Sequence, residues 1–201
     1  YSCGNYRTKT GKRFGSTIEF LIYLGRLRKR GRINQFVKVG KILDIGCGRG
    51  LFLDVMRRGG WDPIGTELNE KTAFYAFKTY GLKVLHGDIT QHKLPSQSLD
   101  AININQVLEH LKNPNQVIEE SYRLLRKGGM LIISVPDLGS PQFAIGKKNW
   151  FLLDLPFHLF HFTEEGLENL LRKNEFKIKH IKRFSLEISP FGWLQTLLNI
   201  S

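Results

Sequence analysis

The chain has 201 residues, 41% of them hydrophobic, and its 30 Lys and Arg against 18 Asp and Glu give a formal net charge of +12. No apolar window is long enough to span a membrane, no segment resembles a signal peptide, and the two cysteines form neither a disulfide framework nor a metal-binding spacing. We therefore expect a soluble domain with a core of its own, working in the cytoplasm and without a bound metal.

Much of the positive charge lies in residues 1–40, which hold ten Lys and Arg residues against one acid. An amphipathic stretch, 18–24, precedes a basic run at 26–32, so we expect a basic helical segment before the main domain, assigned to residues 41–201. A second basic stretch covers residues 177–183. Such stretches are either solvated helix ends or contacts for an anionic partner, such as the inner surface of a membrane, an acidic substrate or nucleic acid.

The first elements of the main domain enclose a glycine-rich turn. Residues 41–50 read KILDIGCGRG, an apolar burst followed by glycines at every second position, and an amphipathic stretch comes next. This order predicts a strand, a tight turn and a helix over residues 50–58. Glycines let a backbone approach a ligand closely, and the start of the helix offers free N–H groups, so we expect a small polar ligand here.

Two common nucleotide-binding motifs do not match this turn. A P-loop needs Lys followed by Ser or Thr after its last glycine, but Gly50 is followed by Leu51 and Phe52. In the dinucleotide fingerprint the third glycine comes one residue later than it does here. Asp44, at the end of the strand, would repel a pyrophosphate and suits a cationic or hydroxyl-bearing ligand.

Three further apolar runs end in polar residues, and each is separated from the last by a helix-length stretch. The first run closes on Glu67 and the second on Asp88. The third, residues 99–104, leads into Asn105 and Gln106. Acids at strand ends are also common as helix caps, so each of them alone is weak support for a ligand site.

Helices alternate with these strands. Apolar residues at three- and four-residue spacing predict helices at 69–80 and 114–127, the first ended by Gly81 and the second by Gly128 and Gly129. Such alternation predicts an α/β fold, a doubly wound, mostly parallel Rossmann-like sheet with helices on both faces. The ligand should lie at the carboxyl ends of the strands, near the switch in strand order.

The regular alternation of predicted strands and helices stops after Pro136. Residues 136–162 contain many aromatics and two histidines but little periodicity, and we expect them to form a functional cover over the ligand. Thr163 is a good N-cap for a helix that ends near Asn174. Residues 176–188 alternate enough to predict a strand.

The Asp-x-Gly-x-Gly-x-Gly pattern that begins at Asp44, with acids at the next strand ends, resembles the class I S-adenosylmethionine-dependent methyltransferases. The resemblance implies S-adenosylmethionine as cofactor and S-adenosylhomocysteine as product. It also implies that Glu67 binds the ribose hydroxyls, that Asp88 holds the adenine amino group, and that Ile89 flanks the ring with its backbone and side chain. A seventh, antiparallel strand follows in this family, and it would lie after Ser201 or be replaced by another element.

The segment after the fourth strand lines the methyl-transfer side of the pocket in this family. Cys47 is expected to be a small buried spacer in the turn and not a nucleophile. The full set of expected cofactor-binding residues is Asp44, Gly46, Cys47, Gly48, Gly50, Glu67, Leu68, Asp88, Ile89, Asn105 and Gln106.

A narrower resemblance rests on residues 106–114 and 158–163. These segments are similar to ubiquinone-biosynthesis O-methyltransferases and to bacterial relatives that act mainly on small molecules, lipids or sugars. The resemblance implies O-methylation of a lipid-linked, sugar or quinone-like small acceptor. Phe157 stands where many relatives have an arginine, so the substrate contact of that arginine is not carried over.

An oxygen nucleophile needs a base near neutral pH, and histidine is the natural supplier. The candidates are His110, His158 and His161. Two alternatives to a small-molecule enzyme stay open: a non-catalytic S-adenosylmethionine-binding module, and an RNA methyltransferase. The Asn/Asp/Ser-Pro-Pro-Tyr/Phe motif of adenine and cytosine amino-methyltransferases is absent, which argues against a nucleic-acid partner but leaves ribose or other base methylation.

Overall fold

The structure of the protein is a computed structural model, which describes residues 16–183 and Thr196. The predicted basic segment 1–40 is therefore described from Ser16 onward. The second half of the predicted strand 176–188 and the expected place of a seventh strand lie outside the described residues.

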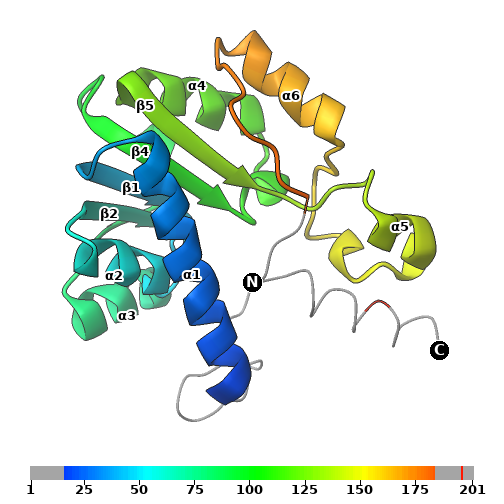
Figure 1. Ribbon diagram of the computed structural model, residues 1–201, viewed down its shortest axis with the longest axis horizontal. Helices are drawn as coiled ribbons and strands as arrows, with labels where there is room; N and C mark the ends of the chain where they lie inside the picture. The colour runs from blue at the N-terminus through cyan, green and yellow to red at the C-terminus, as the bar shows by residue number, and fades with distance from the viewer. Residues whose placement is uncertain (1–15, 184–195, 197–201) are drawn as a thin grey trace.

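A five-stranded parallel sheet forms the centre of the protein (Figure 1). Its strand order is β3-β2-β1-β4-β5. The strands are β1 (Lys41–Ile45), β2 (Asp62–Glu67), β3 (Lys83–His86), β4 (Leu99–Asn105) and β5 (Leu125–Ser134). Because β1 and β4 are neighbours, the order reverses between them, and this is the switch point at which such sheets bind ligands.

One face of the sheet is covered by the first two helices, α1 (Ser16–Phe36) and α2 (Leu51–Arg58). Ile42 of β1 packs there with Met56 of α2 and Ile33 of α1, each at most 1% exposed. Trp61 also contacts helix α1, because its Nε1 donates a hydrogen bond to Asn34 Oδ1 at 3.0 Å. Within the described part of the chain, no helix combines the length and the apolar character needed to cross a membrane.

The opposite face is covered by α4 (Pro114–Leu124) and α6 (Glu164–Lys173). Leu43 of β1 and Ile102 of β4, both fully buried, contact the apolar side of α4 at Ile118. Each such side chain contributes about 1.5–3 kcal/mol by burial. Helices thus lie on both faces of a parallel sheet, which confirms the predicted doubly wound α/β fold.

Helix α3 (Glu70–Tyr80) has the boundaries that its sequence predicts. The side chain of Asn69 accepts a hydrogen bond from Thr72 N and so caps the start of the helix. Gly81 ends it in the left-handed region, with φ 64°, and its N–H donates to Phe77 O.

The predicted end of the next helix at Lys127 was wrong. Helix α4 stops at Leu124, and β5 begins at Leu125, with Gly128 and Gly129 inside the strand. Leu125 already pairs with β4, so contacts with the neighbouring strand override the local preference. These glycines do not end the helix. They lie where the pairing between β4 and β5 shifts in register, and Gly128 has a φ of 82° there.

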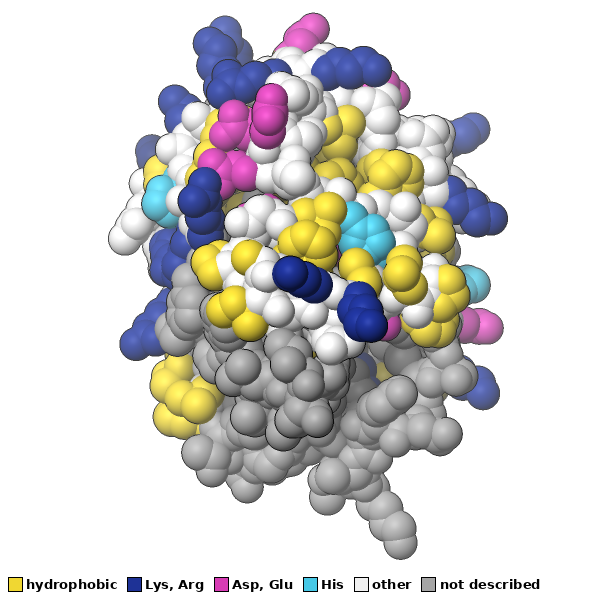
Figure 2. Space-filling view, turned by 90° about the vertical axis from the view of Figure 1, so that its right-hand side faces the viewer, with side chains coloured by type: hydrophobic (Ala, Val, Ile, Leu, Met, Phe, Trp, Pro, Cys, Tyr) yellow, Lys and Arg dark blue, Asp and Glu magenta, His cyan; other side chains and the backbone are white. Residues whose placement is uncertain are grey.

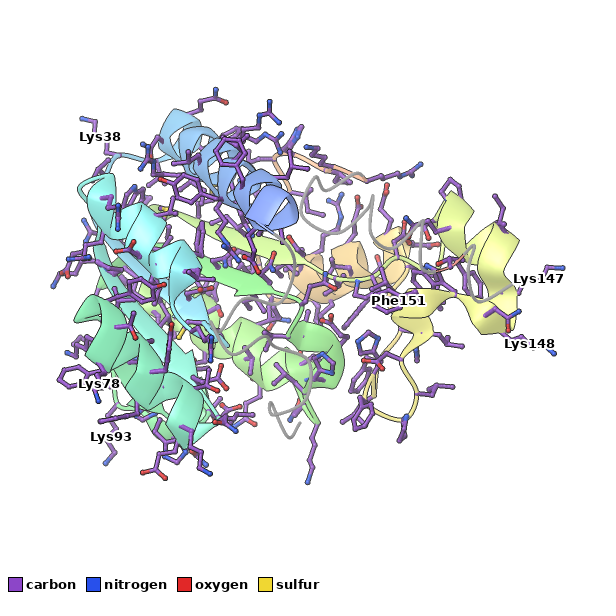
Figure 3. The ribbon with its side chains drawn as sticks, turned by 90° about the horizontal axis from the view of Figure 1, so that it is seen from below. Lys38, Lys78, Lys93, Lys147, Lys148 and Phe151 are labelled. Carbon is purple, nitrogen blue, oxygen red and sulfur yellow. The ribbon has the colours of Figure 1, made fainter. Side chains whose placement is uncertain are left out.

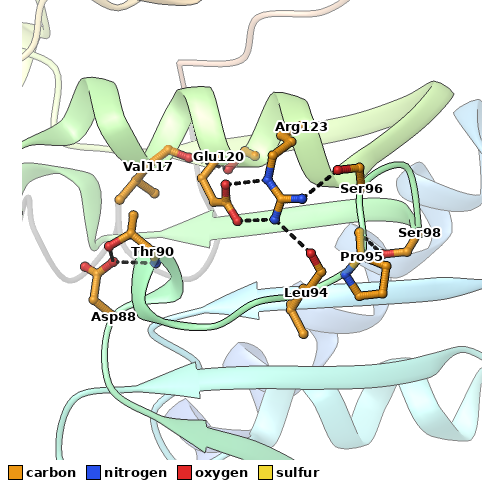
Figure 4. A network of polar contacts seen from close by, with 10 residues as sticks. Asp88, Thr90, Leu94, Pro95, Ser96, Ser98, Val117, Glu120 and Arg123 are labelled. Carbon is orange, nitrogen blue, oxygen red and sulfur yellow. Dashed lines mark hydrogen bonds and ion pairs between the residues drawn. The ribbon is translucent and has the colours of Figure 1, made fainter.

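The connection from β3 to β4 is fastened to α4 by Arg123 (Figure 4). Its guanidinium donates to both carboxylate oxygens of Glu120, to Ser96 Oγ and to Leu94 O, at 2.6–2.8 Å. The connection begins with the short 3-10 helix η1 (Ile89–Gln91). These hydrogen bonds hold the segment that follows the predicted adenine site against α4.

The predicted cover, residues 136–162, contains short helices and turns that extend from one side of the molecule (Figure 1). The helices are α5 (Pro141–Gly146), η3 (Lys147–Asn149) and η4 (Phe151–Leu153). Thr163 caps α6 as predicted, because its hydroxyl accepts from Gly166 N at 3.1 Å.

Residues 176–183 are not a strand, so that prediction was wrong for its described part. The side chains do alternate at first, with Ile178 half-buried between exposed Lys177 and Lys179. Alternation alone is not enough, because a strand also needs a neighbour for its N–H and C=O groups. No strand in the described residues pairs with this segment.

Candidate active site

The glycine turn lies at the switch point, between β1 and α2. Gly46, Gly48 and Gly50 have φ of 69°, 55° and 77°, a region that other residues rarely adopt. A Cβ on Gly46 would collide with Val107, and one on Gly50 would collide with Leu82. A Cβ on Gly48 would meet no atom of the described residues within 4 Å, so these residues leave the backbone there open to a ligand.

Glu67 holds this turn to β2. Its Oε2 accepts from Gly48 N and its Oε1 from Asn69 N, both at 2.9 Å. Each carboxylate oxygen has a second lone pair, so the group can still accept a pair of hydroxyls. The adjacent Leu68 is 65% exposed, which leaves its side chain accessible to a ligand.

Asp44 and Cys47 support the turn from the inside. Asp44 is buried, and its Oδ1 accepts from Asn103 Nδ2 at 2.6 Å. Burial, followed by the negative charges of Asp44 and Glu67, raises the pKa of the Cys47 thiol well above its usual range. This agrees with the predicted spacer role of Cys47, because the nucleophilic form of cysteine is the thiolate.

Asp88 and Ile89 have structural roles at the end of β3. Asp88 Oδ1 accepts from both the backbone N and the hydroxyl of Thr90, at 2.8 and 2.7 Å (Figure 4). Ile89 is 1% exposed and packs in the core with Leu43 and Ile45. The core therefore encloses the Ile89 side chain, and its predicted contact with an adenine ring stays a prediction.

A lysine side chain of α1 reaches the carboxyl end of β4. Lys29 Nζ donates to Asn105 Oδ1 at 3.0 Å and lies 5.3 Å from the centre of the Phe52 ring. Gln106, the next residue of this segment, has φ 54°, and its N–H donates to Ser134 O at 2.8 Å. Sequence reasoning missed Lys29, because no local pattern distinguishes one lysine within a basic run.

The three predicted histidines meet beyond the end of β4. The rings of His110 and His158 are 4.6 Å apart, and His161 is 6.0 Å from His158. The cover is docked beside His110 because the backbone oxygen of Glu109 accepts from Leu159 N and Phe160 N, at 2.8 and 3.1 Å. Figure 2 shows histidine and hydrophobic side chains gathered on this side of the molecule.

Glu109 is the residue at this end of the site that sequence reasoning missed. It lies in the short 3-10 helix η2 (Leu108–His110), and its side chain is fully buried. Within the part of the chain that the structure describes, neither of its carboxylate oxygens has a hydrogen-bond partner. Burial raises its pKa to about 7. The available signal was an acid beside a histidine in an otherwise apolar stretch.

Residues 13–181 match the model of a protein family described as a methyltransferase domain. The chain belongs to this methyltransferase family. It is 33% identical over 146 residues to a probable S-adenosylmethionine-dependent methyltransferase of Mycolicibacterium smegmatis, a match that covers 69% of this chain and 52% of the relative. It is 28% identical over 166 residues to a ubiquinone biosynthesis O-methyltransferase of Pelagibacter ubique, with 78% and 69% of the two chains covered.

A similar solved structure is a crystal structure from Thermotoga maritima, named as an S-adenosylmethionine-dependent methyltransferase and possible histamine N-methyltransferase. It has a TM-score of 0.64 and 26% identity, and the match covers 81% of this chain and 74% of that one. The methyltransferase domain spans about half the length of most of the curated relatives that it matches. The family and these relatives confirm S-adenosylmethionine as the cofactor of the domain.

The residues at the switch point of this methyltransferase domain fit that cofactor. The open backbone at Gly48 allows a close approach, and the Glu67 carboxylate suits hydroxyls and not phosphates. Lys29 adds a positive charge for a carboxylate group. Which of these side chains touch the cofactor remains a prediction.

Three aromatic residues of the cover, Trp150, Phe151 and Phe157, have different environments. Trp150 is 3% exposed and packs edge-on against Phe143, within the cover itself. Phe157 is 51% exposed. Phe151 lies on the side of the cover toward the sheet, whereas Lys147 and Lys148 lie at the outer end of the molecule (Figure 3).

A hollow of about 460 Å³ lies next to the cover and is lined by residues 112–115 and 160–163 with Gly166 and Leu170. His161 is part of this lining, and its Nε2 donates to Leu153 O at 3.0 Å. His161 therefore has a different environment from the other two predicted histidines.

Proposed function

We propose that the protein is an S-adenosylmethionine-dependent methyltransferase that methylates an oxygen of a small acceptor, of lipid-linked, sugar or quinone-like chemistry. One observation carries the proposal: buried Glu109 and the imidazoles of His110 and His158 come together just past the carboxyl end of β4. That strand neighbours β1, whose carboxyl end carries the cofactor turn. The similarity to ubiquinone biosynthesis O-methyltransferases supports the same acceptor class.

Methyl transfer to an oxygen atom has two requirements that the site must meet. The acceptor must be held in line with the sulfonium carbon, so that the O–C bond forms as the C–S bond breaks and S-adenosylhomocysteine leaves. The hydroxyl proton must also be removed. Burial, followed by the neighbouring His110, lowers the pKa of His158, so this imidazole is neutral at pH 7 and able to accept a proton.

We further propose roles for the cofactor contacts. Glu67 binds the ribose hydroxyls, Asp88 accepts from the adenine amino group through Oδ2, and Lys29 pairs with the cofactor's carboxylate. Asn105 and Gln106 line the side on which the methyl group leaves. These roles follow from the open lone pairs of Glu67 and from the position of Lys29 beside Asn105.

Release of S-adenosylhomocysteine tests the proposal. The protein is incubated with S-adenosylmethionine and panels of catechols and quinols, lipid-linked phenols, sugars and RNA. We expect product with one of the small-molecule classes, and loss of turnover with retained cofactor binding in His158→Gln. Cofactor binding with no turnover on any class would favour the non-catalytic module, and turnover on RNA alone would favour the RNA methyltransferase.

We also propose that the basic face of α1 meets an anionic membrane surface. Phe20 and Leu21 are 58% and 54% exposed on this helix. Lys182, from the second basic stretch, lies near Arg28 and Arg32, and its pKa is lowered by burial and then by these two charges. Co-sedimentation with phosphatidylserine vesicles, compared with neutral phosphatidylcholine vesicles, tests this proposal, and equal binding to both would contradict it.

A further inference from the structure

Glu109, His110 and His158 have the geometry of an ion site. One ligand atom from each residue lies within 4.8 Å of the other two. Glu109 is fully buried and His158 is 6% exposed. Neither Glu109 oxygen has a hydrogen-bond partner among the described residues, and a buried ionised carboxylate is costly unless a cation balances it. We propose that this cluster binds one divalent transition-metal ion.

A backbone oxygen holds one ring nitrogen of each histidine. His110 Nδ1 donates to Phe157 O at 3.0 Å, and His158 Nδ1 donates to Leu152 O at 2.9 Å. A carbonyl oxygen only accepts hydrogen bonds, so Nδ1 carries a proton in both rings, and in a neutral ring with this tautomer the lone pair is on Nε2. Metal-binding histidines use this arrangement, in which the second nitrogen fixes the tautomer and the ring orientation.

The donor set determines the class of ion. Two neutral imidazoles and one carboxylate suit Zn²⁺, Mn²⁺, Fe²⁺ or Co²⁺, whereas Mg²⁺ and Ca²⁺ prefer oxygen ligands alone. Tetrahedral ligands with bonds of about 2.0–2.1 Å are about 3.3 Å apart, so the three side chains must close by small rotations around the ion. Asp154 Oδ2, 3.7 Å from His158 Nε2, adds a second carboxylate at the edge of the site.

An ion in this position also has a chemical consequence, which rests on the proposed function. Three protein ligands leave a coordination position open for the acceptor hydroxyl. The ion would lower the pKa of that hydroxyl, so its proton passes to water as the O–C bond forms and the C–S bond of the cofactor breaks. With the ion bound, the histidines hold the ion and water takes the hydroxyl proton, whereas without the ion His158 is the proposed proton acceptor.

Titration of the chelator-treated protein with Co²⁺ tests the site without any acceptor. We expect one Co²⁺ per chain, visible d–d absorption bands, and a raised melting temperature on addition of Co²⁺ or Zn²⁺. Glu109→Gln and His110→Gln should weaken binding at least tenfold. The matched controls are the exposed Glu119→Gln and His180→Gln, which should bind as the unmodified protein does.

Glu109→Gln also controls for misfolding, because it removes a buried charge and keeps the side-chain size. Without metal it should melt no lower than the unmodified protein, and it should gain little from Co²⁺. No Co²⁺ uptake by the unmodified protein, or equal affinity in Glu109→Gln, would overturn the inference. Metal binding without turnover on any acceptor would leave this site intact and refute the proposed function, whereas chelator-resistant turnover without metal uptake would do the reverse.

Discussion

Replacement of Gly48 by alanine tests whether the glycine turn holds the cofactor, and Gly81 provides a matched control. Both glycines have left-handed backbone, with φ of 55° and 64°, and a Cβ on either would have no neighbour within 4 Å in the described part of the chain. Gly81 ends α3, whereas Gly48 lies in the turn at the switch point. The two substitutions therefore carry the same backbone strain and differ in what approaches the new methyl group.

The strain of a left-handed alanine is about 1–2 kcal/mol, which for a chain of this size lowers the melting temperature by about 2–8 °C in both variants. In Gly48→Ala the methyl group also occupies the space that the cofactor's approach requires. A clash of about 1–3 kcal/mol weakens S-adenosylmethionine binding by roughly 5- to 150-fold.

Isothermal titration calorimetry with S-adenosylmethionine and S-adenosylhomocysteine measures the second effect, and thermal unfolding measures the first. Gly81→Ala should bind both ligands within twofold of the unmodified protein while it loses the same stability. Equal cofactor affinity in the two alanine variants would refute the assignment of the turn, because it would mean that no ligand approaches Gly48.

Three other predictions concern single side chains. Glu67→Gln should weaken S-adenosylmethionine binding by about 10- to 150-fold, since charge-assisted hydrogen bonds are worth about 1.5–3 kcal/mol, whereas Glu70→Gln, at an exposed position, should leave it unchanged. Equal calorimetric affinities in the two variants would contradict the ribose assignment. Burial raises the pKa of the Cys47 thiol, so Cys47 should resist iodoacetamide at pH 8 in the native protein and react after unfolding. Peptide mass spectrometry measures the labelling, and fast labelling of Cys47 in the native protein would contradict this prediction. Ile102→Ala, at a fully buried position in the core, should reduce the free energy of unfolding by about 2–5 kcal/mol, as measured by urea titration. A loss below about 1 kcal/mol would contradict this and would show that the core closes around the smaller side chain.

The glycine turn and the histidine cluster depend on different kinds of structural information. The turn is a local feature: its backbone angles follow from glycines two residues apart in one continuous segment. The histidine cluster joins His110, after β4, with His158, 48 residues later in the cover. Its formation depends on the hydrogen bonds between the Glu109 carbonyl and the cover backbone.

Several elements were predictable from sequence because local chemistry decides them. Helix α3 is bounded by the Asn69 cap and by Gly81, and α6 begins at the Thr163 cap. The α4–β5 boundary was not predictable from local propensity, because pairing of Leu125 with β4 ends the helix early. The predicted strand after α6 failed for the related reason that alternation does not supply a partner strand.

The sequence by itself determined the α/β alternation, the glycine turn at the switch point and, through them, the methyltransferase family and its cofactor. These are properties of periodicity and spacing within short segments. Only the tertiary structure decided that Ile89 is enclosed in the core, that Lys29 reaches Asn105, and that the buried carboxylate of Glu109 lies beside two imidazoles. Burial and long-range contacts depend on how distant segments pack, and no short stretch of sequence contains that information.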